Sequence, residues 1–144
     1  MEKLFADTNI LGIAVDREDS RRESVWRILE RVASGEVELH TAKIVIEEIK
    51  QNPHEPTREK ELELVENLTR EIHDRDKKTE DLANKLLNQT SLDVVDSLIV
   101  ALAISNGLIF WSGDRYILRE KVINEIKQVL KKCPEDYTFK YKKE

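Results

Sequence analysis

Lys3-Leu-Phe-Ala-Asp7 is the stretch that decides the fold: a short apolar run that ends at an acid. The apolar residues predict a buried strand, and a brief helix is predicted around residues 10–14. Asp7 can cap that helix, because Asp is a favoured N-cap residue. In an open parallel sheet, however, the carboxyl end of a strand is also where ligands bind. Asp7 is therefore either a cap or part of a site.

Three further segments place an acid at the end or edge of an apolar element, where an unpaired charge is costly. They are Val45-Ile-Glu-Glu-Ile49, Asp93-Val-Val-Asp96 and Trp111-Ser-Gly-Asp-Arg115. One such acid has an ordinary structural explanation, whereas four suggest a shared cation. Oxygen ligands suit Mg²⁺ or Mn²⁺. Zinc is not expected, because the histidines (His40, His54 and His73) show no ligand spacing and fit surface or strand positions.

The order of the predicted elements indicates an α/β fold. Strands are predicted at 3–7, 37–41, 108–112 and 137–141, and the main helices at about 20–35, 42–51, 93–106 and 119–132. Strands that alternate with helices predict one domain with a parallel sheet covered on both sides. At about 55–90 we expect two amphipathic helices that form a charged helical hairpin, joined near residues 74–78.

Composition limits the classes of protein. The 144 residues, 40% hydrophobic, are enough for one domain with a sizeable core. The longest apolar run, Leu98–Ile104, is far shorter than the ~20 residues that cross a bilayer. No secretory signal is visible and the lone Cys133 fits a reducing cytosol, so we expect a cytoplasmic protein without membrane contact. The net charge of −5, without a basic stripe, argues against a protein that coats duplex DNA.

Three of the four segments leave alternatives open. Asp96 can be the third residue of a helix capped by Asp93 and can bond back to it, as in a capping box. Its helical face continues through Val100, however, so its carboxylate is expected to point inward. Glu47 and Glu48 point about 100° apart on a helix, and Glu48 lies at the margin of the buried stripe. Gly113-Asp114 is also an ordinary turn pair.

At these segments the chain resembles the PIN-domain nucleases, especially the VapC-like toxins of toxin–antitoxin pairs. The correspondence follows the order of all four acids and covers nearly the whole chain. It implies a three-layer α/β/α sandwich with a central, mainly parallel sheet, formed by residues 1–144 as a single PIN-like domain. By this resemblance the catalytic and metal-binding residues are Asp7, Glu48, Asp96 and Asp114, with Asn9 and Ser112 as supporting residues.

The resemblance implies an endoribonuclease that needs Mg²⁺ or Mn²⁺ and cleaves RNA phosphodiester bonds with a cation-activated water. It also implies a small antitoxin protein as partner and a homodimer. The chain departs from the pattern at Tyr116, where many members carry another acid, so one or two metals are both open. Two other functions stay open: a PIN-like RNA-binding or scaffold module without catalysis, and an RNA-processing nuclease outside toxin–antitoxin systems.

Partner contacts can be assigned only as candidates. Val25, Trp26 and Leu29 on the second predicted helix are candidate antitoxin contacts, although core packing explains such an apolar stripe equally well. Arg115, beside the fourth acid, is a candidate phosphate contact.

Overall fold

The computed structural model describes residues 1–144, which form five strands and seven helices. In chain order they are β1 (Glu2–Ala6), α1 (Thr8–Val15), α2 (Arg22–Ala33), β2 (Val37–Ala42), α3 (Lys43–Lys50), α4 (Glu55–Leu68), β3 (Thr69–His73), α5 (Lys77–Gln89), α6 (Val94–Ser105), β4 (Ile109–Ser112), α7 (Glu120–Lys131) and β5 (Tyr141–Lys143). None of the seven helices combines the length and the apolar character that crossing a bilayer requires.

All strands lie parallel in one sheet of order β3-β2-β1-β4-β5, which confirms the predicted parallel sheet. The chain first builds outward from β1 through β2 to β3, and then crosses to the other side of β1 to form β4 and β5. The strand order therefore reverses between β1 and β4. In open α/β sheets the crevice outside the carboxyl ends of two such strands is the usual ligand site.

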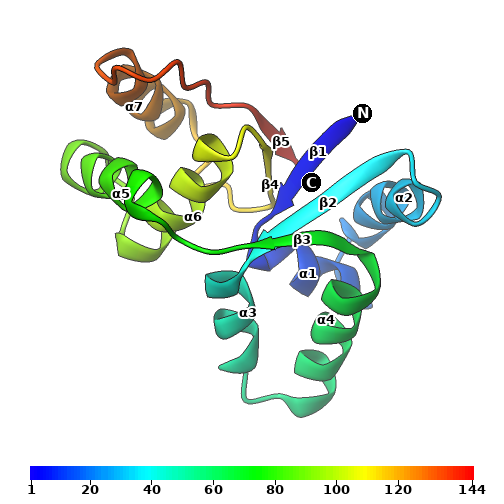
Figure 1. Cartoon of the computed structure of the whole chain (residues 1–144). Helices are drawn as coiled ribbons and strands as arrows, with labels where there is room; N and C mark the ends of the chain where they lie inside the picture. Colours follow the sequence, from blue (N-terminus) through cyan, green and yellow to red (C-terminus); the bar gives the residue numbers. More distant parts are fainter.

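Helices cover both faces of the sheet, which confirms the three-layer sandwich. In Figure 1, α5, α6 and α7 lie on one side of the sheet and α1 to α4 on the other. The side chains of β1 alternate accordingly, as a strand requires. Leu4 and Ala6 pack in the core cluster that contains α1 and α2 residues, whereas Phe5 packs in the cluster that contains α6.

The most apolar helix, α6, lies in the centre of its layer. Its residues from Ser97 to Ile104 are all buried, as the continuous apolar pattern predicted. Gly107 follows with a φ of +68°, a left-handed conformation that glycine adopts without steric cost. The chain can therefore reverse directly from α6 into β4, and this short connection fixes where β4 ends beside β1.

The prediction of a helical hairpin at about 55–90 is wrong about the segment that joins its two helices. Helices α4 and α5 are present, but β3 lies between them and pairs in parallel with β2. The strand was missed because it is an edge strand with a mostly polar, exposed sequence, Thr69-Arg-Glu-Ile-His73, and so lacks an apolar alternation. The last strand is also displaced: β5 begins at Tyr141, not at residue 137.

Candidate active site

Asp7 lies at the carboxyl end of the central strand and is almost fully buried, with 6% of its surface exposed. It is the N-cap of α1, since its Oδ1 accepts a hydrogen bond of 2.7 Å from the Thr8 amide. Its Oδ2 accepts bonds from Asn9 Nδ2 at 3.0 Å and from Ser112 Oγ at 2.9 Å. Asp7 thus caps a helix, and it also holds the ends of β1 and β4 together.

Asn9 and Ser112 fix the loop that follows β4. Asn9 Oδ1 accepts a 2.7 Å hydrogen bond from the Gly113 amide, and Ser112 Oγ accepts one of 2.9 Å from the Asp114 amide. The side chains of these residues therefore set the path of the backbone from β4 to Asp114. The two residues predicted to support the acids contact Asp7 directly, which gives them a positioning role.

Gly113 is required by a close approach of the chain to α1. A Cβ at this position would lie 2.7 Å from Ile13 Cδ1, a buried side chain, and 3.2 Å from Arg21 Nη1. We therefore expect Gly113→Ala to destabilise the protein by about 1–3 kcal/mol, the usual cost of overpacking. Urea denaturation of the variant and wild type measures this difference. Equal unfolding midpoints would mean that Ile13 moves away without cost.

Asp96 is a half-buried acid on the first turn of α6. Asp93 caps this helix, because its Oδ1 accepts a 2.8 Å hydrogen bond from the Asp96 amide. The reciprocal bond of a capping box is absent: the Asp96 carboxylate accepts no hydrogen bond. Burial, followed by the charges of Asp93 and the other three candidate acids, raises the pKa of Asp96 from 3.8 to about 7. Capping therefore accounts for Asp93 and leaves the side chain of Asp96 unexplained.

Of the two adjacent glutamates, Glu48 is the one that reaches Asp7. The Thr8 hydroxyl donates a 2.7 Å hydrogen bond to Glu48 Oε1, and the charge of Glu48 raises the pKa of Asp7. Glu47 instead borders a small cleft with Lys43 and Asp74. Sequence reasoning did not assign Thr8 to the site. Its position directly after Asp7 was the available signal.

Asp114 closes the site on the β4 side. Its Oδ1 accepts hydrogen bonds from the amides of Tyr116 at 2.8 Å and Ile117 at 3.3 Å, so it also organises a turn. Tyr116, which replaces the further acid of the pattern, donates a 3.0 Å hydrogen bond from its hydroxyl to the Ser91 carbonyl. Tyr116 thus links the Asp114 turn to the segment before α6.

The four acids form one electrostatic group. Burial is the largest cause that raises the pKa of Asp7 to about 6, and Glu48 and Asp114 add to it. Their carboxylates are more widely spaced than the ligands of a closed coordination sphere. In this structure three ligand atoms lie within 4.8 Å of one another only at a different place, among His40, Glu71 and His73. All donors at the acidic site are oxygens, and the Asp96 carboxylate has no partner within the protein. This donor set fits a hard divalent cation.

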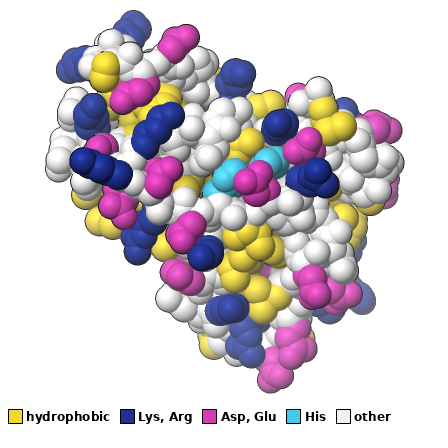
Figure 2. Space-filling model, viewed as in Figure 1, with side chains coloured by type: hydrophobic (Ala, Val, Ile, Leu, Met, Phe, Trp, Pro, Cys, Tyr) yellow, Lys and Arg dark blue, Asp and Glu magenta, His cyan; other side chains and the backbone are white.

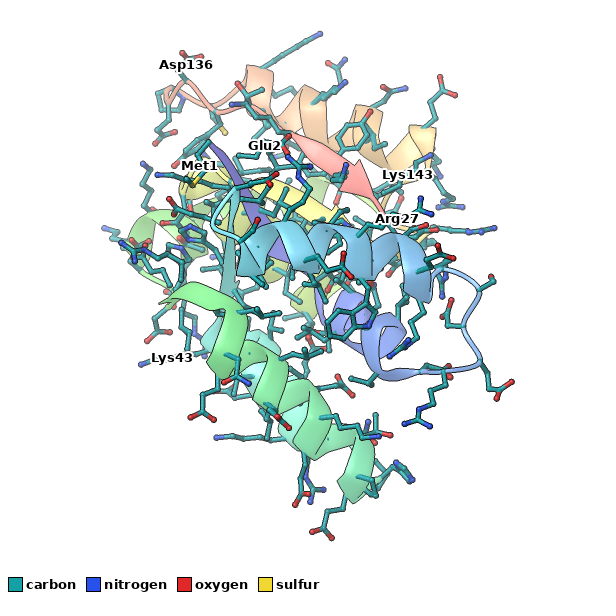
Figure 3. All side chains as sticks on the ribbon, turned by 90° about the vertical axis from the view of Figure 1, so that its right-hand side faces the viewer. Met1, Glu2, Arg27, Lys43, Asp136 and Lys143 are labelled. Carbon is teal, nitrogen blue, oxygen red and sulfur yellow. The ribbon has the colours of Figure 1, made fainter.

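A cleft of about 490 Å³ borders Asp114 and is lined by side chains of both charges. Arg115, Arg119 and Lys143 supply positive charge, and Asp114, Glu120 and Glu144 supply negative charge. In Figure 3, Lys143 lies at the tip of β5, at the opposite end of the sheet from Met1. These three basic side chains therefore lie at the same end of the sheet as Asp7 and Asp114, beside the acids of the cleft. Only Arg115 of these three was a candidate from the sequence.

The candidate antitoxin contacts divide into two groups. Val25 and Leu29 are buried and belong to the core, so they are not available to a partner. Trp26 is partly exposed, and its indole nitrogen donates a 2.8 Å hydrogen bond to the Ala14 carbonyl. It borders a groove of about 450 Å³ between α1, α2 and α4, together with Leu64 and Leu68.

The class of protein follows from this site. It lies in the crevice where the strand order reverses, with one acid after β1, one after β4, and one each from α3 and α6. The family model of the PIN domain matches residues 4–121, and the chain belongs to this family. PIN domains are generally nucleases. No curated protein sequence matches the chain.

Solved structures share the fold at low sequence identity. The structure of VapBC2 from Rickettsia felis bound to a DNA fragment from their promoter is 17% identical, with 98% of each chain covered and a TM-score of 0.68. FitAcB from Neisseria gonorrhoeae is 14% identical over 86% of this chain and 93% of that chain, with a TM-score of 0.61. FitAB bound to the IR36 DNA fragment is 12% identical over 97% and 94%, with a TM-score of 0.60.

Proposed function

We propose that the protein is a metal-dependent endoribonuclease whose centre consists of Asp7, Glu48, Asp96 and Asp114. The observation that carries the proposal is the Asp96 carboxylate, which is half-buried, accepts no hydrogen bond and has a pKa raised to about 7. An acid without a partner in such a place is a candidate for function. A divalent cation is the partner that would compensate the charges of all four acids.

The four acids of such a centre would have different roles. Asp7 and Asp114 hold fixed positions, because their hydrogen bonds tie them to α1 and to the turn after β4. Glu48 is oriented by Thr8, and Asp96 faces the other acids from α6. When bound, Mg²⁺ or Mn²⁺ would lower the pKa of a water and stabilise the charge that develops on the phosphate.

The three basic side chains of the cleft beside Asp114 support a nucleic acid as the substrate. A chain of net charge −5 has no general attraction for phosphates, so its cations must act locally. Arg115, Arg119 and Lys143 lie in the cleft that Asp114 borders, where they can hold phosphates on one side of the acids. We propose a single-stranded RNA, because such a cleft can follow one flexible backbone and because the chain resembles the toxin branch of the family.

A small partner protein is proposed for the groove beside Trp26. The similar structures include VapBC2 of Rickettsia felis and FitAB, and each of these is described in complex with DNA. The groove has an apolar floor from Ala14, Trp26 and Leu64 and a charged rim that includes Arg17 and Lys60. These properties suit an amphipathic segment of an antitoxin.

We also propose, from the same branch of the family, that the chain acts as one domain and forms a homodimer.

The test is RNA cleavage by the purified full chain, with Mg²⁺ or Mn²⁺ and with a chelator. We expect cleavage only with the cation, and we expect Glu48→Gln to lower its rate strongly because a ligand loses its charge. Glu47→Gln is the matched control and should cleave at the wild-type rate, since Glu47 faces another cleft. Cation binding without cleavage of any RNA would favour the non-catalytic RNA-binding module instead.

A further inference from the structure

Strands β2 and β3 carry the same short pattern, Glu-x-His, at the edge of the sheet: Glu38-Leu-His40 and Glu71-Ile-His73. Residues two apart on a strand share a face. The pairing shifts by one residue between Leu39 and His40, so that Glu71 rather than Arg70 lies opposite His40. Bulges of this kind redirect side chains. Here the bulge brings both histidines and both acids to one face.

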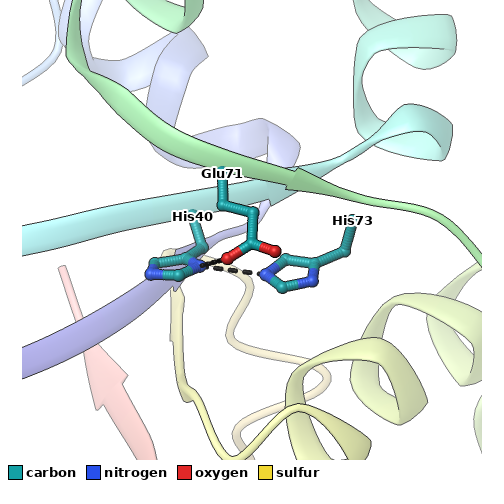
Figure 4. A group of neighbouring side chains, drawn as sticks. All are labelled: His40, Glu71 and His73. Atoms are coloured by element: carbon teal, nitrogen blue, oxygen red, sulfur yellow. Dashed lines mark hydrogen bonds and ion pairs between the residues drawn. The ribbon is translucent and has the colours of Figure 1, made fainter.

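The side chains converge on one point. His40 Nδ1 lies 2.9 Å from His73 Nε2 and 3.9 Å from Glu71 Oε2, and the three ligand atoms all lie within 4.8 Å of one another (Figure 4). Two imidazole nitrogens and one carboxylate oxygen form a ligand set that zinc uses, with a fourth position left for water. Mg²⁺ prefers oxygen ligands, so this cluster differs in chemistry from the acidic centre.

Glu38 orients the buried histidine for this role. His40 Nε2 lies 3.1 Å from Glu38 Oε1, within hydrogen-bonding distance. An ionised carboxylate accepts, so the proton of the neutral His40 ring lies on Nε2. Nδ1 then presents a lone pair toward His73 and Glu71. A carboxylate behind a metal-bound histidine is the usual arrangement at zinc sites.

The alternative is that the two histidines form only a hydrogen-bonded pair. Their ring planes are inclined by 14° and their centroids are 5.2 Å apart, so the two rings meet edge to edge. A tetrahedral Zn²⁺ at its usual distance from each nitrogen would set them about 3.3 Å apart, a few tenths of an ångström more than the observed 2.9 Å. With Zn²⁺ at its Nε2, His73 would carry its ring proton on Nδ1.

We propose that His40, Glu71 and His73 bind a zinc-class cation that ties the exposed edge strand β3 to β2. The three middle residues of β3 are exposed, and its only partner in the sheet is β2. In Figure 2, histidine side chains reach the surface over this strand beside acidic ones, so a cation can enter from solvent. None of the three residues belongs to the proposed nuclease centre, and the inference does not depend on that centre.

The test is a Zn²⁺ titration of the full chain, stripped of metal, in the presence of excess Mg²⁺ to fill oxygen-only sites. We expect one Zn²⁺ per chain and a higher melting temperature when it is bound. His73→Ala and Glu71→Gln should abolish this binding, and Glu38→Gln should weaken it by about 10–100-fold. Far-ultraviolet circular dichroism of each variant checks that the fold is kept.

Two control variants lie outside the cluster. His54→Asn removes an exposed histidine but keeps a favoured N-cap residue at the start of α4, and Glu66→Gln removes an exposed acid. Both should bind Zn²⁺ like wild type. Absence of binding, or binding unchanged in His73→Ala and lost in Asp96→Asn, would overturn the proposal. The first result leaves a hydrogen-bonded pair, and the second assigns the zinc to the acidic centre.

Discussion

Replacing Asp96 by Asn is expected to abolish RNA cleavage while the fold is kept. The carboxylate accepts no hydrogen bond, so the amide breaks no contact within the protein. The substitution removes a negative charge that is repelled by the charges of Asp93, Asp7, Asp114 and Glu48. The free energy of unfolding at neutral pH should therefore stay equal or rise. Loss of a cation ligand should lower activity by more than the ~10–100-fold that removal of an outer-shell partner costs.

Asp93, one turn away, provides the matched control. Its carboxylate caps α6, so Asp93→Ala should cost about 1 kcal/mol of stability, the typical value for a lost N-cap. Cleavage should persist in this variant, because Asp93 is not among the proposed ligands. Cleavage rates and urea unfolding of both variants give the two comparisons. Wild-type cleavage by Asp96→Asn would exclude the proposed mechanism, and loss of its fold would assign Asp96 a structural role.

Without divalent cations, the protein is expected to lose stability as the pH rises from 3.8 to about 7. Asp7 and Asp96 have folded-state pKa values of about 6 and about 7, both above the ordinary 3.8. In this range the folded state holds more protons than the unfolded state, so the free energy of unfolding falls with pH. The shift at Asp7 alone corresponds to about 3 kcal/mol. Asp96 acts in the same direction, and solvent screening of its half-exposed charge reduces its total contribution.

The measurement is the free energy of unfolding across this pH range for wild type and Asp96→Asn. Asp19, Glu38, Asp74 and Asp76 have lowered pKa values and act in the opposite direction, so the difference between the two proteins is the relevant quantity. The wild-type curve should fall more steeply. Excess Mg²⁺ should remove this difference, because a bound cation stabilises the ionised carboxylates. Parallel curves would mean that Asp96 titrates normally.

The fold was predictable where apolar patterns are strong and less so at the edge of the sheet. β1 and α6 are buried, and their sequences show it directly. β3 exposes the middle of its sequence, and only its pairing with β2 holds it in the sheet. Tertiary pairing of this kind leaves no periodic signal in a single sequence.

The same limit applies to the sites. The order of the acids and the resemblance were enough to select Asp7 and Asp114. Hydrogen bonds with Ser112 locate both acids where the strand order reverses between β1 and β4. The histidine cluster was missed because His40 and His73 are 33 residues apart and meet only through β3. The repeated Glu-x-His pattern was its available signal.

The position of β1 at the centre of the sheet has a consequence for synthesis. Ser112, on the strand beside Asp7, is synthesised 105 residues after it. Their contact cannot form before that much chain has been made. A growing chain therefore carries its first acid long before it has the other three in place. If the proposed nuclease function holds, the message and ribosome that produce the protein meet no assembled centre until Asp114 has been made.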